Sequence, residues 1–227
     1  WMPDQSLLFS DMPHDKRRRW REYEGVTIER AESDKCNGMT IDNGGALIVC
    51  EHSTSRVVRE AADGSRTVLA ERGVYRVTRA GELQLLAADF GQPNGLCLSP
   101  DESRLYVGDT ERAHIRSFQY DANGALSDDR VFASGISAVS DNSDGFVDGM
   151  KVDELGNLYV TGPEGIWIFD PAGNRIGTIE VPEKVSNLNW GDSDWRTLYI
   201  TASTSVYRVR TKVRGNQLGY MRAGRSQ

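Results

Sequence analysis

The chain has 227 residues, of which 38% are hydrophobic and 26% are charged, and its formal net charge is −6 at pH 7. This composition is typical of a soluble globular protein with a good-sized core, and the acidic balance argues against nucleic acid or an anionic membrane as a partner. No apolar run comes near the roughly 18 residues of a helical membrane span. The basic run Lys16–Arg19 is predicted to be solvated surface between a strand and a turn.

The cysteines Cys36, Cys50 and Cys97 are odd in number and far apart. This pattern favours free thiols in a reducing compartment over a disulfide scaffold, so we expect a cytoplasmic protein. No signal-peptide pattern is present. The sequence starts at Trp1 rather than Met, which leaves a removed leader as an open alternative.

Five segments share one pattern, in which a leucine opens an apolar strand that ends in a small or acidic residue and follows an Asp-rich turn. In chain order they are Leu7–Asp11, Leu47–Glu51, Leu105–Asp109, Leu158–Gly162 and Leu198–Ala202. Strands with an aromatic or β-branched centre follow, most clearly Val74–Val77, Ile115–Phe118, Ile166–Phe169 and Val206–Val209. No segment has a sustained helical period. Such a repeat is the signature of four-stranded β-propeller blades rather than a sandwich.

The leucines that open these strands are 40, 58, 53 and 40 residues apart, whereas a blade takes roughly 40–50 residues. The interval of 58 is irregular because Val57–Arg59 and Val74–Val77, two strands of the second type, stand almost together. We therefore predict that the two inner strands of one blade are absent near Glu71–Arg72. The start at Trp1 falls where an inner strand would already be under way. The expected organisation is one all-β propeller domain over residues 1–214 and a tail over 215–227.

Three Asn-Gly or Asp-Gly steps precede short apolar strands, namely Asn37-Gly38, Asn94-Gly95 and Asp148-Gly149. Because they recur in register, we expect the repeat to bring them to one mouth of the propeller channel, with Asn187 as a fourth analogue. Their amide and carboxylate oxygens suit Ca²⁺ or a similar hard divalent ion, and no His or Cys joins them as zinc would favour. The alternative is that each step is only a tight turn.

Glu51 and His52 end one of the leucine strands and are candidates for contact with a substrate. For each, the alternative is a loop residue bonded to the backbone, and the sequence does not decide between them. His14 and His114 are predicted to be ordinary surface residues. Ser-His-Asp catalysis has no support, because no Gly-x-Ser-x-Gly elbow is present.

Several segments together resemble the SMP-30/gluconolactonase family. They are Gln92–Leu96 with Leu98–Glu102, Val147–Asp153 with Gly156–Val160, and, for the bacterial gluconolactonase branch, Leu8–Asp11 and Ile48–His52. The resemblance covers nearly the whole chain. It implies a six-bladed propeller that holds one divalent metal ion in its channel and hydrolyses sugar lactones. It also implies that Asn94 and Asp148 are metal ligands, that Asp148 is the catalytic acid/base, and that Asn37 contacts the substrate.

The sequence departs from the family pattern at three places. Lys35 stands where the animal proteins have an arginine that contacts substrate. A glutamate ligand, in a Glu-Gly-Pro-Val type of segment, belongs before the position of Trp1, and a further asparagine belongs at the gap near Glu71–Arg72. If these segments are lost from the protein itself, the resemblance implies an incomplete metal shell and no activity.

The sequence thus predicts hydrolysis of a gluconolactone-like sugar lactone. One divalent ion, Ca²⁺ in preference to Zn²⁺ or Mn²⁺, acts as Lewis acid, and Asp148 acts as general acid/base. A metal-dependent phosphotriesterase or other ester hydrolase on a similar propeller stays open as an alternative. So does a non-catalytic propeller with a structural calcium ion, because a fold alone does not fix a function. The expected partner is a small-molecule lactone, with no nucleic acid and no membrane.

Overall fold

The computed structural model describes the chain except for residues 1, 3, 42–45, 79–80, 137–144 and 218–227. Within the described part the protein is almost entirely β, with 20 strands and one three-residue 3-10 helix, Met12–His14. The predicted lack of helices is confirmed there, and no helix among these residues is long and apolar enough to cross a membrane. The chain divides into two compact units, Trp1–Gly73 and Val74–Gln227.

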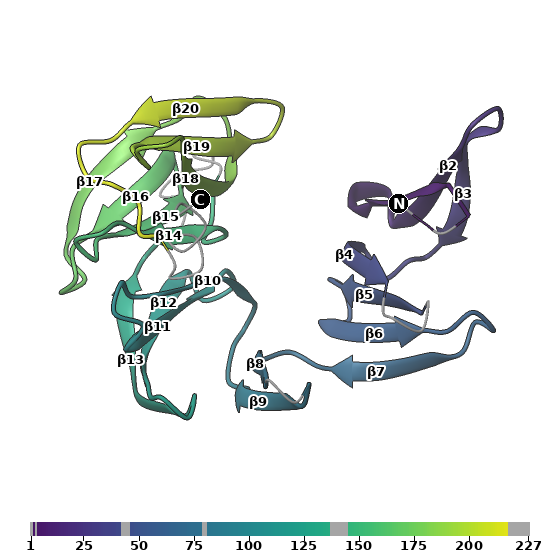
Figure 1. The fold of residues 1–227 in the computed structure, drawn as a ribbon, viewed down its shortest axis with the longest axis horizontal. Coiled ribbons are helices and arrows are strands. Elements are labelled where there is room, and N and C mark those ends of the chain that lie inside the picture. Colours follow the sequence, from purple (N-terminus) through teal and green to yellow (C-terminus); the bar gives the residue numbers. More distant parts are fainter. Residues whose placement is uncertain (1, 3, 42–45, 79–80, 137–144, 218–227) are drawn as a thin grey trace, which may run out of the picture. The chain divides into compact units, whose positions relative to one another are not determined.

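The first unit contains two antiparallel sheets whose strands follow the order of the sequence (Figure 1). The three-stranded sheet consists of β1 (Leu7–Asp11), β2 (Lys16–Arg21) and β3 (Gly25–Ala31). The four-stranded sheet consists of β4 (Cys36–Ile41), β5 (Leu47–Glu51), β6 (Arg56–Glu60) and β7 (Arg66–Ala70). Buried Cys36, Leu47 and Val49 pack with Leu8 of β1, so the two sheets share a small core.

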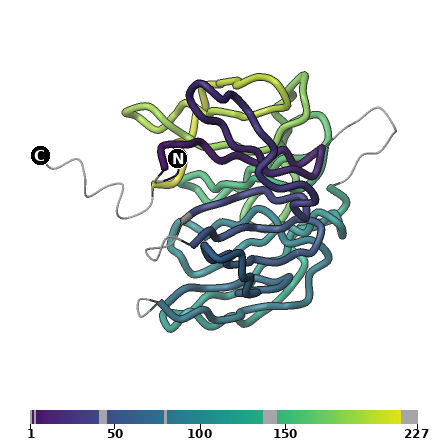
Figure 2. The backbone as a smooth tube through the Cα atoms, turned by 90° about the vertical axis from the view of Figure 1, so that its right-hand side faces the viewer, coloured from purple at the N-terminus to yellow at the C-terminus, as the bar shows by residue number. Residues whose placement is uncertain are grey.

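The second unit contains four antiparallel sheets with the same sequential strand order (Figure 1). Figure 2 traces the backbone of this unit from teal to yellow. The first has only β8 (Val74–Val77) and β9 (Leu83–Ala87). The next two are β10 (Pro93–Leu98), β11 (Arg104–Asp109), β12 (His114–Tyr120) and β13 (Leu126–Ser134), then β14 (Met150–Val152), β15 (Leu158–Gly162), β16 (Gly165–Phe169) and β17 (Arg175–Glu180). The last has β18 (Val185–Gly191), β19 (Thr197–Ala202) and β20 (Val206–Arg210).

The middle strands of these sheets are buried on both faces because consecutive sheets stack face to face. In β15 every residue is buried: Leu158 and Val160 pack with Tyr106 and Ile115 of the preceding sheet, whereas Tyr159 packs with residues of the following one. Such stacking of sequential meanders is the architecture of propeller blades. The predicted all-β propeller class is therefore confirmed.

The number of strands per sheet departs from the expected four in three sheets of the described part. In the sheet of β8 and β9, the strands present are those expected on the outside of a blade. Because β7 ends at Ala70 and β8 begins at Val74, the chain has no length for two further strands between them. The predicted absence of inner strands near Glu71–Arg72 is confirmed.

The interpretation of Lys16–Arg19 as solvated surface is wrong for Arg17. Its side chain, on β2, is only 3% exposed, and its guanidinium forms ion pairs with Glu29 of β3 and, at 2.8 Å, with Glu60 of β6. The stacking of the first two sheets encloses the middle of β2 and places these carboxylates beside it. Arg17 is thus part of a buried ionic network within the first unit.

Candidate functional site

Asn94, Asp148 and Asn187 lie at the starts of three successive inner strands of the second unit, and glycines let these strands approach closely. A Cβ atom on Gly95 would lie 1.9 Å from the backbone oxygen of Asp148, and one on Gly149 would lie 2.4 Å from Asn187 Oδ1. Neither glycine has a positive φ. These two Asn/Asp-Gly steps therefore serve close approach between strands rather than tight turning, and they bring the three polar residues together.

Two threonine hydroxyls hold the residues that begin these strands. Thr110, which follows β11, accepts a hydrogen bond from Asn94 Nδ2 at 3.1 Å and donates one to the carbonyl of Val147 at 2.5 Å. Thr161 of β15 accepts a hydrogen bond from the backbone N–H of Asp148 at 2.8 Å and donates to the carbonyl of Phe146 at 2.9 Å. The segment that carries Asp148 is thus anchored by Thr161 of its own sheet and by Thr110 of the preceding sheet.

Asp148 is half-buried, and burial raises the pKa of its carboxyl group above the ordinary value, while a hydrogen bond from the Asn94 side chain partly offsets this effect. The carboxylate forms no ion pair with a described residue. A half-buried carboxylate without a positive partner among the described residues is one that a bound cation would stabilise.

Asp109, the last residue of β11, fixes the loop that leads to Asn94. Its side chain is fully buried and accepts hydrogen bonds from the backbone N–H groups of Gly91 at 2.7 Å, Gln92 at 2.9 Å and Arg112 at 3.2 Å. Burial raises the pKa of Asp109, but these backbone donors outweigh it, and the pKa is lowered. Asp109 therefore stays ionised as a structural anchor.

The prediction that His114 is an ordinary surface residue is wrong. Its side chain is 16% exposed, with Nε2 3.9 Å from Asp109 Oδ2, and burial lowers its pKa. His114 opens β12 and pairs with Asp109 across the sheet, which explains its enclosure. Cys97, on β10 behind Asn94, is also enclosed: burial raises the pKa of its thiol to about 12, so it is not a nucleophile at neutral pH.

The other predicted site residues belong to the first unit, where they gather at one end of β4 and β5. Lys35 precedes β4, which carries Asn37, and Glu51 ends β5 opposite Cys36. The backbone N–H of His52 donates to the carbonyl of Lys35 at 3.3 Å. The side chains of Lys35, Asn37 and His52 are exposed, as substrate contacts must be.

Glu51 differs from these three residues because its side chain is only 3% exposed. It is ion-paired with Arg66 of β7, and its Oε2 accepts a hydrogen bond from Thr54 Oγ1 at 2.7 Å. Both partners belong to its own sheet or the adjoining turn. This pairing favours a structural role for Glu51, although contact with a substrate stays a prediction.

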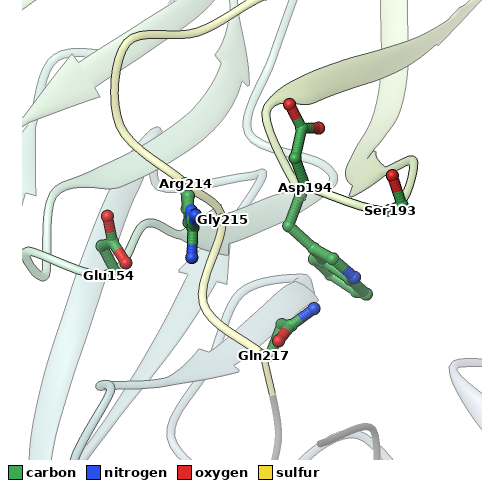
Figure 3. Close-up of a pocket in the computed structure, with 7 residues that line it drawn as sticks. Glu154, Ser193, Asp194, Arg214, Gly215 and Gln217 are labelled. Atoms are coloured by element: carbon green, nitrogen blue, oxygen red, sulfur yellow. The ribbon is translucent and has the colours of Figure 1, made fainter. Parts of the chain in front are cut away.

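A cavity of about 470 Å³ lies next to Glu154, which follows β14, whereas Asp148 precedes that strand. Figure 3 shows residues that line the cavity. It is lined by Glu154 after β14, by Ser193–Trp195 between β18 and β19, and by Arg214, Gly215 and Gln217. Gly215 forms an isolated bridge with Asp153, and the N–H of Asn216 donates to the carbonyl of Val152. The first residues of the predicted tail, Gly215 and Asn216, are therefore attached to the end of β14. Residues 218–227 lie outside the described part.

Sequence reasoning missed Thr110, Thr161 and Asp109. The sequence pattern singled out only the position of Asp109, as the acidic residue that ends a leucine strand; Thr161 stands one residue before such an end, and Thr110 follows one. Among the residues that the structure describes, no group of three or more His, Cys, Asp or Glu side chains is placed to hold a metal ion. The oxygen donors that the structure brings together are instead one carboxylate, Asp148, and the amides of Asn94 and Asn187.

Comparison with known proteins identifies the relatives of this chain. The SMP-30/Gluconolactonase/LRE-like region matches residues 70–204. A gluconolactonase of Zymomonas mobilis is 39% identical over 271 residues, covering 92% of this chain and 76% of that enzyme. Because the alignment is longer than the 227 residues of this chain, the enzyme has internal segments without a counterpart here. This agrees with the incomplete sheet of β8 and β9.

Two solved structures share the fold. A gluconolactonase of Xanthomonas campestris matches with a TM-score of 0.57 and 28% identity, covering 91% of this chain and 82% of that one. Regucalcin of Agrobacterium tumefaciens, a calcium-binding protein, matches with a TM-score of 0.58 and 18% identity, covering 94% and 90%. At this identity, the second match bears on the fold alone.

Proposed function

Because the chain belongs to the SMP-30/gluconolactonase/LRE-like family, we propose that it is a hydrolase that opens sugar lactones to their hydroxy acids. The observation that carries the proposal is the adjacency of Asn94 and Asp148 at the starts of β10 and β14, with Gly95 against the Asp148 carbonyl. The relatives named gluconolactonase support the substrate class. We further infer that the whole propeller has six blades, since the described strands fall into six sheets.

The residues of the second unit fit a hard divalent cation. The amide nitrogen of Asn94 donates hydrogen bonds to Thr110 and to the Asp148 carboxylate, which leaves the amide oxygen available. Asp148 offers a half-buried carboxylate. Oxygen donors of these two kinds are those that Ca²⁺ prefers, so we propose Ca²⁺, with Mn²⁺ or Zn²⁺ as alternatives, held by Asn94 and Asp148. When bound, the ion supplies Lewis-acid stabilisation of the negative charge that develops on the lactone carbonyl oxygen.

Asp148 is the proposed general acid/base. The backbone N–H of Asp148 is hydrogen-bonded to Thr161, and this bond fixes the position of the backbone that carries the carboxylate. In the mechanism, the carboxylate accepts a proton from the attacking water as the water oxygen bonds to the carbonyl carbon. It then returns the proton to the ring oxygen as the carbon–oxygen ester bond breaks. One water is consumed, and one hydroxy acid is formed.

Residues of the first unit are proposed to bind the sugar. Asn37 offers an exposed amide and Lys35 an exposed ammonium group, with His52 and Glu51 at the neighbouring strand end. Such contacts supply binding that is equal in ground and transition states. An Asn37→Ala variant should therefore raise KM for the lactone with little change in kcat. Because the cysteines are free, we still propose a reducing, cytoplasmic location for the protein.

The test is hydrolysis of glucono-1,5-lactone in a pH-stat, on chelator-treated protein and again after addition of Ca²⁺, Mn²⁺ or Zn²⁺. We expect turnover above the spontaneous rate only with an ion present. In the Asp148→Asn variant, turnover should fall by about 10²–10⁴-fold, the usual contribution of a positioned acid/base. Glu102→Gln, which changes an exposed residue in the turn before β11, is the matched control and should behave as the original chain.

Each alternative function has its own outcome. Hydrolysis of a phosphotriester or simple ester in preference to every lactone would replace the lactonase by another ester hydrolase. An ion that raises the melting temperature without any hydrolysis would identify a structural metal site. Full lactonase activity in folded, ion-saturated Asp148→Asn would contradict the proposed role of Asp148.

A further inference from the structure

Thr110 sits between the two residues of the proposed site and contacts both of their strands. Its hydroxyl is 3.1 Å from Asn94 Nδ2 and 2.5 Å from the carbonyl oxygen of Val147, the residue before Asp148. Its backbone N–H donates to the carbonyl of Gln92 at 2.9 Å. Thr110 thus meets the Asn94 side chain, the loop before it and the segment that carries Asp148.

The hydroxyl has only one proton, and this fixes the direction of both hydrogen bonds. The carbonyl of Val147 can only accept, so the Thr110 proton must go to it. Thr110 Oγ1 is then an acceptor toward Asn94, and the group of Asn94 that faces it must be the amide NH₂. If Asn94 were turned by 180°, two oxygen acceptors would face each other without a proton between them.

We propose that Thr110 is a positioning residue that sets the orientation of the Asn94 carboxamide, so that its oxygen remains free to bind a cation beside Asp148. This inference rests on the proposed function, because a free oxygen is useful only if the site takes an ion. Both hydrogen bonds of the Thr110 hydroxyl go to protein groups, so its proposed role is indirect. Outer hydrogen-bonding partners of this kind commonly change metal affinity by about 10–100-fold when removed.

The anchoring of Thr110 supports this role. Asp109, next to it, accepts hydrogen bonds from the N–H groups of Gly91 and Gln92, so the end of β11 holds the loop before Asn94 at three backbone points. The hydroxyl of Thr161, in contrast, binds only backbone groups, the N–H of Asp148 and the carbonyl of Phe146. Of the two threonine hydroxyls, only that of Thr110 contacts the Asn94 amide, whose NH₂ group also donates a hydrogen bond to the Asp148 carboxylate.

The experiment compares Thr110→Val, which keeps the shape but removes the hydroxyl, with Thr110→Ser, which restores it. Thr178→Val is the matched control, because its hydroxyl accepts one bond from Arg175 on the outer strand β17. Calcium affinity is measured by titration calorimetry, and folding by the melting temperature. We expect Thr110→Val to bind Ca²⁺ about 10-fold or more weakly, Thr110→Ser to stay within about 3-fold of the original chain, and Thr178→Val to match it.

A second measurement does not depend on the ion or on activity. The side-chain NH₂ resonances of Asn94, assigned by their loss in Asn94→Ala, should shift in ion-free Thr110→Val and return in Thr110→Ser. Unshifted resonances, or unchanged Ca²⁺ affinity in a folded Thr110→Val, would overturn the positioning role. Failure of the original chain to bind Ca²⁺, Mn²⁺ or Zn²⁺, with these resonances still shifting, would instead overturn the proposed function.

Discussion

Glu183, in the turn before β18, is a partly exposed carboxylate held by uncharged donors. It accepts hydrogen bonds from the backbone N–H and hydroxyl of Thr204 and from the hydroxyls of Ser205 and Tyr207. The bonds from Ser205 and Tyr207 contribute most, and the pKa of Glu183 is lowered from 4.5 to about 2. The carboxylate therefore ties this turn to β20 in its ionised form only.

This lowered pKa predicts how the stability contributed by Glu183 depends on pH. Because the folded pKa lies below the unfolded value, the contribution is complete above pH 4.5 and is lost as the pH falls toward 2. The melting temperature of Glu183→Gln should thus lie below that of the original chain by a constant amount above pH 4.5. The difference should shrink toward zero on acidification. A difference independent of pH would contradict the prediction.

The contact between β10 and β14 depends on the missing side chain of Gly95. In a Gly95→Ala variant, the new Cβ atom would lie 1.9 Å from the carbonyl oxygen of Asp148, so the two strands must separate. We expect a loss of about 1–3 kcal/mol in the free energy of unfolding, the usual cost of overpacking, and reduced lactone turnover because Asn94 and Asp148 move apart. Urea unfolding and the pH-stat assay measure the two effects.

Gly177, on the outer strand β17, provides the control for this change. A Cβ atom there would meet nothing within 4 Å, and its φ is not positive. Gly177→Ala should therefore be neutral or stabilise the protein by about 0.5–1 kcal/mol, because alanine loses less backbone entropy on folding. If Gly95→Ala unfolded at the same urea concentration as Gly177→Ala, close approach between β10 and β14 would not explain why residue 95 is a glycine.

The two sheets of the first unit are joined by the ionic network around Arg17. Replacing this 3% exposed arginine by alanine leaves the carboxylates of Glu29 and Glu60 without their buried partner. We expect Arg17→Ala to lower the free energy of unfolding by about 2–3 kcal/mol. This is less than the roughly 3–5 kcal/mol of a fully buried pair that loses one member, because Glu29 keeps Arg19 and Glu60 keeps Arg30 as partners. Arg21 is 41% exposed and lies 3.3 Å from Asp4. Arg21→Ala should therefore lower the free energy of unfolding by only about 0–1 kcal/mol. Equal losses in urea unfolding would refute the buried network.

Across the whole molecule, the repeat of buried strands was predictable, whereas contacts between side chains of distant strands were not. The bounds predicted for Leu7–Asp11, Leu47–Glu51 and Leu158–Gly162 are those observed. Leu158–Gly162 is buried along its whole length by stacked sheets and is therefore apolar, whereas no residue of Leu7–Asp11 is fully buried. Asn94 and Asp148 meet as predicted since their glycines recur in register.

Two of the failures have one physical cause, which is that the sequence does not reveal a partner far along the chain. From the sequence alone Arg17 is predicted to be solvated, because its partner Glu60 lies 43 residues later in the chain. The role of Thr110 depends on a carbonyl 37 residues later, at Val147. A charged or hydroxyl-bearing residue looks the same in a sequence whether its side chain faces water or a distant strand. Only the structure shows which of these side chains are buried.

Calcium should stabilise the protein as a whole if Asn94 and Asp148 hold it. An ion that binds only the folded state at 100 times its Kd adds about 2.7 kcal/mol to the free energy of unfolding. For a chain of this size, each kcal/mol raises the melting temperature by about 2–4 °C, so a rise of about 5–10 °C is expected at that ratio. Scanning calorimetry of chelator-treated protein with increasing CaCl₂ measures this shift, with NaCl of equal ionic strength as the control.

The variants locate the site of that stabilisation. Asp148→Asn keeps the shape but removes the charge, so its melting temperature should not respond to calcium, whereas Glu102→Gln should respond as the original chain does. An equal rise in Asp148→Asn would place the ion elsewhere in the molecule. No rise with Ca²⁺, Mn²⁺ or Zn²⁺ in the original chain would mean that two oxygen-bearing side chains on adjacent strands do not suffice to hold a cation, because Ca²⁺ takes about six to eight oxygen ligands.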